Sequence, residues 1–258
     1  ALFTWHQILE NPRNNTAAAS PFLGPQYSNT QIRDALTEHN ANFQELSSVE
    51  LTDAVADDLS NEKIIGWFQN RMEFGPRALG NRSILADPRP KNIQDQLNRT
   101  VKFREPFRPF APVILQEESA KWFSTDHPSP LMSFAAFLQP AVPTTMFPGI
   151  THVDRSSRIQ TIASVDNPIL HQLLDRFRTR TDCPMLVNTS FNVRGEPIVC
   201  SPDDAYRCFM KTNLDTLAIG NFYLVKEDQP EAKIESPPQK QKITWLNRSF
   251  HAWEMLTF

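Results

Sequence analysis

Cations are concentrated in one short part of the sequence, between residues 71 and 108. This stretch holds nine Lys and Arg residues against four acidic ones, a local charge of +5. The whole chain of 258 residues has 26 Lys and Arg against 29 Asp and Glu, a net charge of −3, so the remainder is acidic. A basic segment inside an acidic chain indicates an anion site. The near-neutral total argues against a protein that coats nucleic acid over its whole surface.

The first half of this segment reads EFGPRALGNR from Glu73 to Arg82. Three of the seven glycines fall between residues 66 and 80, a placement typical of turns with positive φ or close backbone approach. Pro76 suits the first position of a short helix, whose free N–H groups would favour an anion. Arg77 and Arg82 would add positive charge at that end. The glycine spacing matches neither a Walker A loop nor a dinucleotide-binding fingerprint.

The second half alternates cations with aromatic residues and reads KFREPFRPF. In a strand, Lys102 and Arg104 would face the same side. Together with Arg108 they place three cations within seven residues, which suits a di- or triphosphate. Two alternatives stay open. One is a solvated basic surface paired with Glu73 and Glu105, and the other is nucleic acid stacked on the aromatic rings.

Two later motifs offer further polar contacts. NTSFNVRGEP begins at Asn188, directly after a predicted strand, where small polar side chains often line ligand crevices. Ser190 would contact a phosphate and Asn192 a carbonyl or ribose, unless the motif is only an Asx- or ST-type turn. In HVDRSSRIQ, Arg158 begins a predicted strand and offers another anion contact; the alternative is a surface salt bridge with Asp154. No second His stands near this motif, which disfavours a metal site there.

The elements that must position these residues alternate irregularly, which predicts an α/β or α+β domain with a mixed sheet. An apolar fraction of 40% in a chain of this length suits a sizeable core. Helices are expected over 1–10, 28–39, 49–59, 92–101, 117–123, 168–180 and 202–211. Strands are expected over 63–68, 82–86, 111–115, 132–138, 158–165, 185–188 and 216–225.

Compartment signals are those of a cytoplasmic protein. The three cysteines are odd in number and have no C-x-x-C spacing, which disfavours a zinc site or a disulfide framework. No apolar run approaches a membrane span, and the first residues lack the basic region of a signal peptide. No membrane partner is therefore expected. The missing initiator Met indicates a fragment or a processed chain.

Four strings in order, GWFQNRMEFGPRALGNRSILADPR, VKFREPFRPFAPVIL, HVDRSSRIQT and NTSFNVRGEPIVCSP, resemble the C-terminal domain of the O-carbamoyltransferases of the NodU/CmcH/TobZ type. The resemblance covers roughly residues 21–225. It implies a YrdC-like twisted mixed β-sheet with flanking helices over 28–226. Residues 1–27 would be the last helix of a missing Kae1-like domain plus a linker, and 227–258 a C-terminal extension.

The resemblance also implies a reaction. Carbamoyl phosphate and ATP, with substrate-borne Mg²⁺, would form carbamoyl-adenylate in this domain. The Kae1-like domain, which holds its own metal, would pass the carbamoyl group to an acceptor hydroxyl. No metal ligands are expected in the present chain. An already anionic carbamate needs no general base, and the screening of two polyanions is the main task of the site.

The site residues divide by their source. Arg77, Lys102 and Arg108 match family positions that bind carbamoyl phosphate, ATP or the adenylate, and they are the expected catalytic residues. The resemblance assigns further ligand contacts to Arg158, Asn188 and Ser190, and the residue patterns add Arg82, Arg104 and Asn192. One departure is the run VDRSSR, where the family has Gly and Thr or Ala after the Asp.

Alternatives from other functional classes stay open beside this hypothesis. One is a non-catalytic nucleotide- or RNA-binding YrdC-like module. Another is a structural half that completes the interface of the missing domain. The expected partners are small-molecule substrates and the Kae1-like domain of the same protein, with nucleic acid disfavoured and a homodimer left open. The sequence does not name the carbamoyl acceptor.

Overall fold

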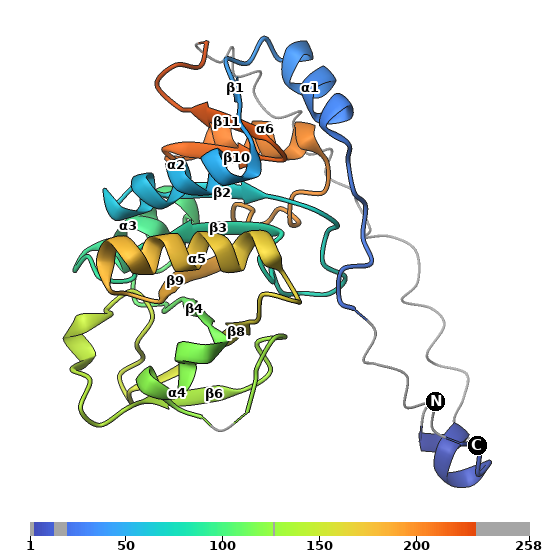
Figure 1. The fold of residues 1–258 in the computed structure, drawn as a ribbon, viewed down its shortest axis with the longest axis vertical. Helices are drawn as coiled ribbons and strands as arrows, with labels where there is room; N and C mark the ends of the chain where they lie inside the picture. The colour runs from blue at the N-terminus through green and yellow to red at the C-terminus, as the bar shows by residue number, and fades with distance from the viewer. Residues whose placement is uncertain (1–2, 13–19, 126, 231–258) are drawn as a thin grey trace, which may run out of the picture.

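An eight-stranded sheet forms the centre of the protein, seen in a computed structural model that describes residues 3–12, 20–125 and 127–230 (Figure 1). Strands β10 and β2 are parallel, as are β4 and β8, and the other neighbours are antiparallel. The predicted mixed sheet is confirmed. In spatial order the strands are β1 (Gln44–Glu45), β11 (Phe222–Val225), β10 (Thr216–Ile219), β2 (Ile65–Phe68), β3 (Arg82–Ala86), β9 (Met185–Ser190), β4 (Ala111–Leu115) and β8 (Gln160–Ile162).

A small antiparallel sheet lies beside the large one and consists of β5 (Phe123–Ser124), β6 (Ala135–Leu138) and β7 (Ser156–Arg158). Only Ile159 separates β7 from β8, so the chain passes directly from one sheet into the other. The prediction that Arg158 begins a strand is therefore wrong. Arg158 ends β7, and the following strand belongs to the large sheet.

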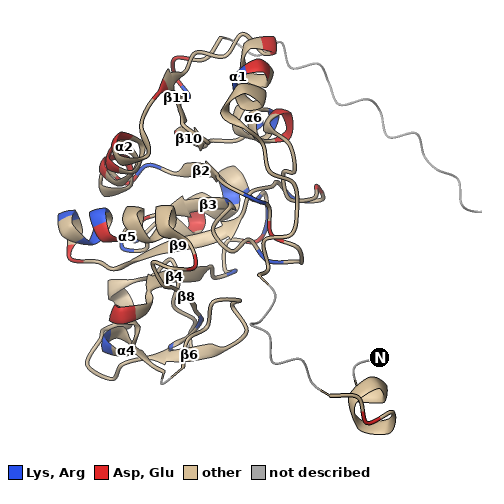
Figure 2. Cartoon of the chain, turned by 45° about the vertical axis from the view of Figure 1, so that its right-hand side comes forward, with Lys and Arg blue, Asp and Glu red and all other residues tan. Residues whose placement is uncertain are grey.

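Helices cover both sides of the large sheet. Figure 2 shows α2 (Ser48–Ser60) and α5 (Pro168–Thr181) on one side of the strands, with α1 (Asn29–Glu38) and α6 (Pro202–Lys211) on the other. Serine side chains cap α1, α2 and α6 in capping boxes, in which the third helical residue bonds back to the cap. The shorter helical pieces are Thr4–Ile8, α3 (Ile93–Gln96), Leu97–Val101, Gln116–Glu118, α4 (Ser119–Trp122) and Thr144–Met146.

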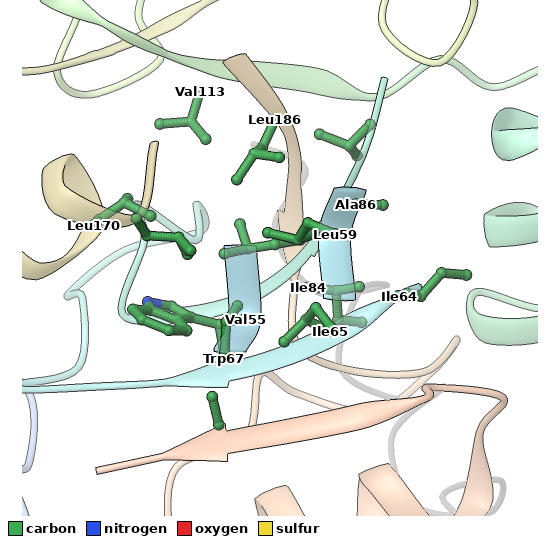
Figure 3. Close-up of a cluster of buried hydrophobic side chains, with 14 of the residues drawn as sticks. Val55, Leu59, Ile64, Ile65, Trp67, Ile84, Ala86, Val113, Leu170 and Leu186 are labelled. Carbon is green, nitrogen blue, oxygen red and sulfur yellow. The ribbon is translucent and has the colours of Figure 1, made fainter. Parts of the chain in front are cut away.

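The core between the large sheet and α2 and α5 is fully apolar at its centre (Figure 3). Trp67 of β2 is completely buried, and its indole N–H donates to the carbonyl of Gly80 at 2.9 Å. Val55 and Leu59 of α2 and Leu170 of α5 pack over the same strands, as Figure 3 shows. The strands that carry the motifs therefore rest on a rigid, close-packed support.

Three local predictions are wrong. Residues 216–225 form two strands joined at Gly220, whose φ of +54° allows the tight turn. No helix follows Pro76; residues 74–80 form an irregular loop. Lys102 and Arg104 do not lie on one side of a strand, because residues 102–110 form a loop after the helical turn that ends at Val101.

The structure describes only part of the two end segments for which domain limits were predicted. The predicted N-terminal helix is reduced to a π-helical turn over Thr4–Ile8 without a buried residue. Part of the predicted linker, residues 13–19, lies outside the described residues, as does most of the predicted C-terminal extension, residues 231–258.

Candidate anion-binding site

Two adjoining cavities lie where the segment after Val101 meets the large and the small sheet. The first, of about 370 Å³, is lined by Lys102, Arg104, Glu105, Arg108, Ser190, Asn192, Val193, Arg194 and Gly195. The second, of about 400 Å³, is lined by Arg104, Arg108, Pro109, Phe110, Ala111, Ala135, His152, Ser156 and Arg158. Arg104 and Arg108 line both cavities. We call these two residues the shared arginine wall.

Lys102 is the most deeply buried cation of the first cavity, with 5% of the residue exposed. Its ammonium donates to Ser190 Oγ at 3.2 Å, to Asn192 Oδ1 at 2.9 Å and to the Asn192 carbonyl at 3.1 Å, and it also contacts the Ser190 carbonyl. None of these acceptors is a carboxylate. Burial, followed by the nearby charge of Arg104, lowers the pKa of Lys102 to about 7. An anion in the cavity would favour its charged form.

The shared arginine wall combines two like charges. Burial, followed by the charge of Arg108, lowers the pKa of Arg104. Arg108 is half exposed and lies 4.0 Å from the carboxylate of Glu105. A bond from its own backbone N–H and the charge of Arg108 hold the pKa of Glu105 below its usual value. With Lys102, the first cavity still has an excess of positive charge, which suits an anionic ligand.

Arg158 provides a third cation that lines the second cavity. Burial, followed by the charge of Arg77, lowers its pKa, so these two arginines lie close enough to repel. The buried Nε of Arg158 has no hydrogen-bond partner among the described residues. Arg77 is exposed on the irregular loop after Pro76 and lines neither cavity. A ligand in the second cavity would meet the positive charge of Arg158.

Asn188 lies behind that loop and also lines neither cavity. Its amide donates to Gln160 Oε1 at 2.7 Å and to the Ala78 carbonyl at 3.3 Å, and Gln160 donates to the Leu79 carbonyl at 2.8 Å. The two buried amides therefore tie the loop that carries Arg77 to β8 and β9. Asn188 Oδ1 is buried without a partner among the described residues.

Arg82 has a different position from the one expected. It is fully buried, donates to backbone carbonyls of Gln69, Asn70, Asn81 and Pro25, and lies 3.5 Å from the ring centre of Phe68. It lines neither cavity. We therefore correct its predicted role as a ligand contact, since backbone oxygens surround its guanidinium.

Glu73 explains why no helix follows Pro76. Its Oε1 accepts from the backbone N–H groups of Leu79 and Asn81 at 2.7 Å and from that of Arg82 at 3.2 Å. Gly75 and Gly80, with φ of +137° and +102°, bend the loop around the carboxylate. The N–H groups that were expected to bind a ligand at this loop are thus partly occupied by the protein itself.

Two residues of the site are missed by the sequence patterns. Arg194 lines the first cavity from the turn at Gly195, and its charge beside Ser190 was a usable signal. Asn98 is fully buried and contacts three residues of the segment that forms the shared arginine wall. Nothing in its spacing distinguishes it from an ordinary helical asparagine.

Other classes of site have less support among the described residues. In that part of the chain, no group of three His, Cys, Asp or Glu side chains is arranged to hold a metal ion. No described helix combines the length and the apolar character that crossing a membrane requires. His152 lines the second cavity, and the neighbouring Asp154 accepts from the Ser156 hydroxyl at 2.7 Å. Asp154 thus stabilises the turn before β7.

Comparison of the sequence with known families establishes the family of the chain. Residues 56–226 match the model of the family described as Carbamoyltransferase C-terminus. The chain belongs to this family, and the expected resemblance is confirmed.

Similar proteins extend the comparison. The uncharacterized protein sll1178 of Synechocystis sp. is 44% identical over 93% of this chain and 43% of its own length. The 3′-hydroxymethylcephem-O-carbamoyltransferase of Streptomyces clavuligerus is 36% identical over 66% of this chain and 32% of its own length. The chain therefore spans less than half the length of these relatives. Full-length HypF in its phosphate- and nucleotide-bound form overlaps 69% of this chain and 22% of its own, with a TM-score of 0.48 and 17% identity.

Proposed function

We propose that the two cavities bind ATP and carbamoyl phosphate and that the chain forms carbamoyl-adenylate from them. The observation that carries this proposal is the shared arginine wall. Two adjoining cavities with common cations suit two polyanions that must react with each other. Lys102 adds charge to the first cavity and Arg158 to the second.

The proposed reaction has two steps. Water cleaves carbamoyl phosphate into carbamate and phosphate. A carbamate oxygen then attacks the α-phosphorus of ATP, the bond to the β-phosphate oxygen breaks, and pyrophosphate leaves. The nucleophile is already an anion, so the task of the protein is to bring anions together and to stabilise charge on the leaving group. Mg²⁺ bound to ATP would share that task.

The residues have distinct parts in this proposal. Arg104 and Arg108 offer planar donors suited to phosphate oxygens, and Lys102 offers a point charge. Ser190 and Asn192 hold Lys102 at the end of β9. Arg158, which lines the second cavity, and the neighbouring Arg77 add further positive charge.

The second half-reaction is assigned to the part of the longer relatives that this chain does not span. We propose that a preceding Kae1-like domain transfers the carbamoyl group to an acceptor hydroxyl, as the name of the cephem relative implies for that protein. The three free cysteines suit a reducing compartment such as the cytoplasm, where ATP is made.

The direct test measures pyrophosphate release by this chain with ATP and carbamoyl phosphate together and with each alone. We expect release only with both substrates, and ATP binding by calorimetry. Absence of both ATP binding and pyrophosphate release would contradict the proposal. For variants that remove a cavity arginine, Arg33→Ala is the matched control. Arg33 is a half-exposed arginine that pairs with Glu45 away from the cavities.

Nucleic acid remains a second candidate on one observation. Phe103 and Phe107, beside the cations of the same segment, are 49% and 76% exposed and available for base stacking. RNA affinity that falls steeply with salt would favour this reading. The two cavities favour small anions instead.

A further inference from the structure

Asn98 lies behind the shared arginine wall and is completely buried. Its Oδ1 accepts from Arg104 Nε at 2.7 Å. Its Nδ2 donates to the carbonyl of Arg108 at 2.8 Å and to that of Pro106 at 3.1 Å. Its own carbonyl accepts from the backbone N–H of Arg104 at 3.0 Å. One residue thus fixes both the side chain of one arginine and the backbone of the other.

The local backbone explains why Asn98 can reach so far. Residues 97–101 form a wide π-helical turn, closed by a bond from the N–H of Lys102 to the Leu97 carbonyl at 2.9 Å. Phe103 then takes a left-handed conformation with φ of +48°. Such a residue ends a helix and turns the chain back on itself, a role that glycine usually has. The reversal brings Arg104 back over Asn98 while Lys102 points toward β9.

The amide is chemically suited to this position because it is neutral. A carboxylate there would also orient Arg104 but would cancel part of the charge of the shared arginine wall. Asn98 accepts from Nε only, so the two terminal nitrogens of Arg104 are not used by this amide, and the guanidinium lies 4.8 Å from the ring centre of Phe110. Those nitrogens remain available to a ligand in either cavity.

We propose that Asn98 is the positioning residue of the shared arginine wall, orienting Arg104 through its amide oxygen and fixing Arg108 through its amide nitrogen. The inference rests on the proposed binding of ATP in the cavities. Without Asn98, Arg104 would lose the acceptor of its Nε. Its repulsion from Arg108 would then favour other positions of the side chain.

The test compares ATP affinity by calorimetry in the wild-type chain, Asn98→Ala and Asn98→Asp. We expect both variants to bind ATP at least about tenfold more weakly, as for the loss of one charge-assisted contact. Thr216→Val is the matched control for a buried polar loss. Thr216 donates to Asp58 at 2.8 Å in β10, away from the cavities. That variant should lose thermal stability but keep the affinity for ATP.

A second measurement separates positioning from general loosening of the fold. In a background that carries Arg104→Ala and Arg108→Ala, Asn98→Ala should change the residual ATP affinity by less than about twofold, because neighbours acting through one another are non-additive. An equal loss in both backgrounds overturns the inference, as does wild-type affinity in Asn98→Ala. If Asn98→Ala does not fold, Asn98→Asp is compared in the same two backgrounds. Wild-type chain that fails to bind ATP overturns the proposed function itself.

Discussion

The loop from Glu73 to Arg82 and the segment from Lys102 to Arg108 both contain a buried cation that protein oxygens bind, but only Lys102 also lines a cavity. The guanidinium of Arg82 is enclosed by backbone carbonyls and the ring of Phe68, with Glu73 nearby. Lys102 lines a cavity, and the charge of Arg104 lies close enough to lower its pKa. A buried cation enclosed on all sides by protein groups suits a structural role, whereas one that lines a cavity beside further cations suits the proposed binding of an anion.

The largest expected effect is the loss of Arg82. Arg82→Leu leaves several buried carbonyls without a donor and Glu73 without its neighbouring charge, so we expect the free energy of unfolding to fall by about 3 to 5 kcal/mol. Urea denaturation measures this change. A loss below about 1 kcal/mol would mean that Arg82 does not have the structural role that distinguishes its loop from the segment of Lys102.

Loss of Arg108 should weaken ATP binding but leave the stability of the fold nearly unchanged. Arg108→Ala removes a half-exposed side chain, so stability should stay within about 0.5 kcal/mol of wild type. ATP binding should weaken by about 1.5 to 3 kcal/mol, the range for a charge-assisted contact. Calorimetry with ATP measures this change. Arg33→Ala should leave the affinity unchanged, and equal losses in both variants would remove the contrast.

The next prediction uses the pH dependence of Lys102. The folded chain releases this proton near pH 7, whereas an ordinary lysine in the unfolded chain holds it to about 10.5. Between these values the unfolded state binds more protons, so this group makes the fold more stable as the pH rises. ATP affinity should respond in the opposite sense, because the neutral amine no longer attracts a phosphate.

The measurement is the ratio of ATP affinities of the wild-type chain and Lys102→Gln, which cancels the titration of ATP itself. We expect the ratio to be about tenfold at about pH 6 and to approach one at about pH 9. A ratio that stays constant over this range would show that the charge of Lys102 does not contribute to binding.

The smallest expected effect concerns Phe103. Phe103→Gly relieves a left-handed φ of +48° but adds chain entropy to the unfolded state, so stability should change by less than about 1 kcal/mol. ATP affinity should stay unchanged, since the bonds of Asn98 to the arginines are kept. A clear loss of affinity would show that the exposed ring of Phe103 contacts the ligand.

The sequence predicted most of the fold because local signals and burial agree there. Strands β2 and β4 are continuous apolar runs, and α5 begins at a proline and an asparagine cap. The helix expected after Pro76 fails because the carboxylate of Glu73 bonds the N–H groups of the loop. That contact depends on how a loop closes, which no periodicity in the sequence reports.

The same reasoning applies to the candidate site. Lys102, Arg104 and Arg108 were found from their charge and spacing, and the structure places all three at the first cavity. Arg82 has the same charge and stands in an equally conspicuous motif, yet it lines neither cavity. Its position depends on carbonyls from both sides of the loop, including that of Pro25 far away in the sequence. Side-chain chemistry identifies candidates, and only tertiary contacts separate them.

The wall that the two cavities have in common has a thermodynamic consequence. An anion in either cavity compensates part of the charge of Arg104 and Arg108, and the occupant of the other cavity meets what is left. Each of the two proposed ligands would therefore alter the affinity for the other by the same factor, whichever binds first. If both ligands bind as proposed, the two sites would form a single linked equilibrium, and the dissociation constant of one ligand would depend on the concentration of the other.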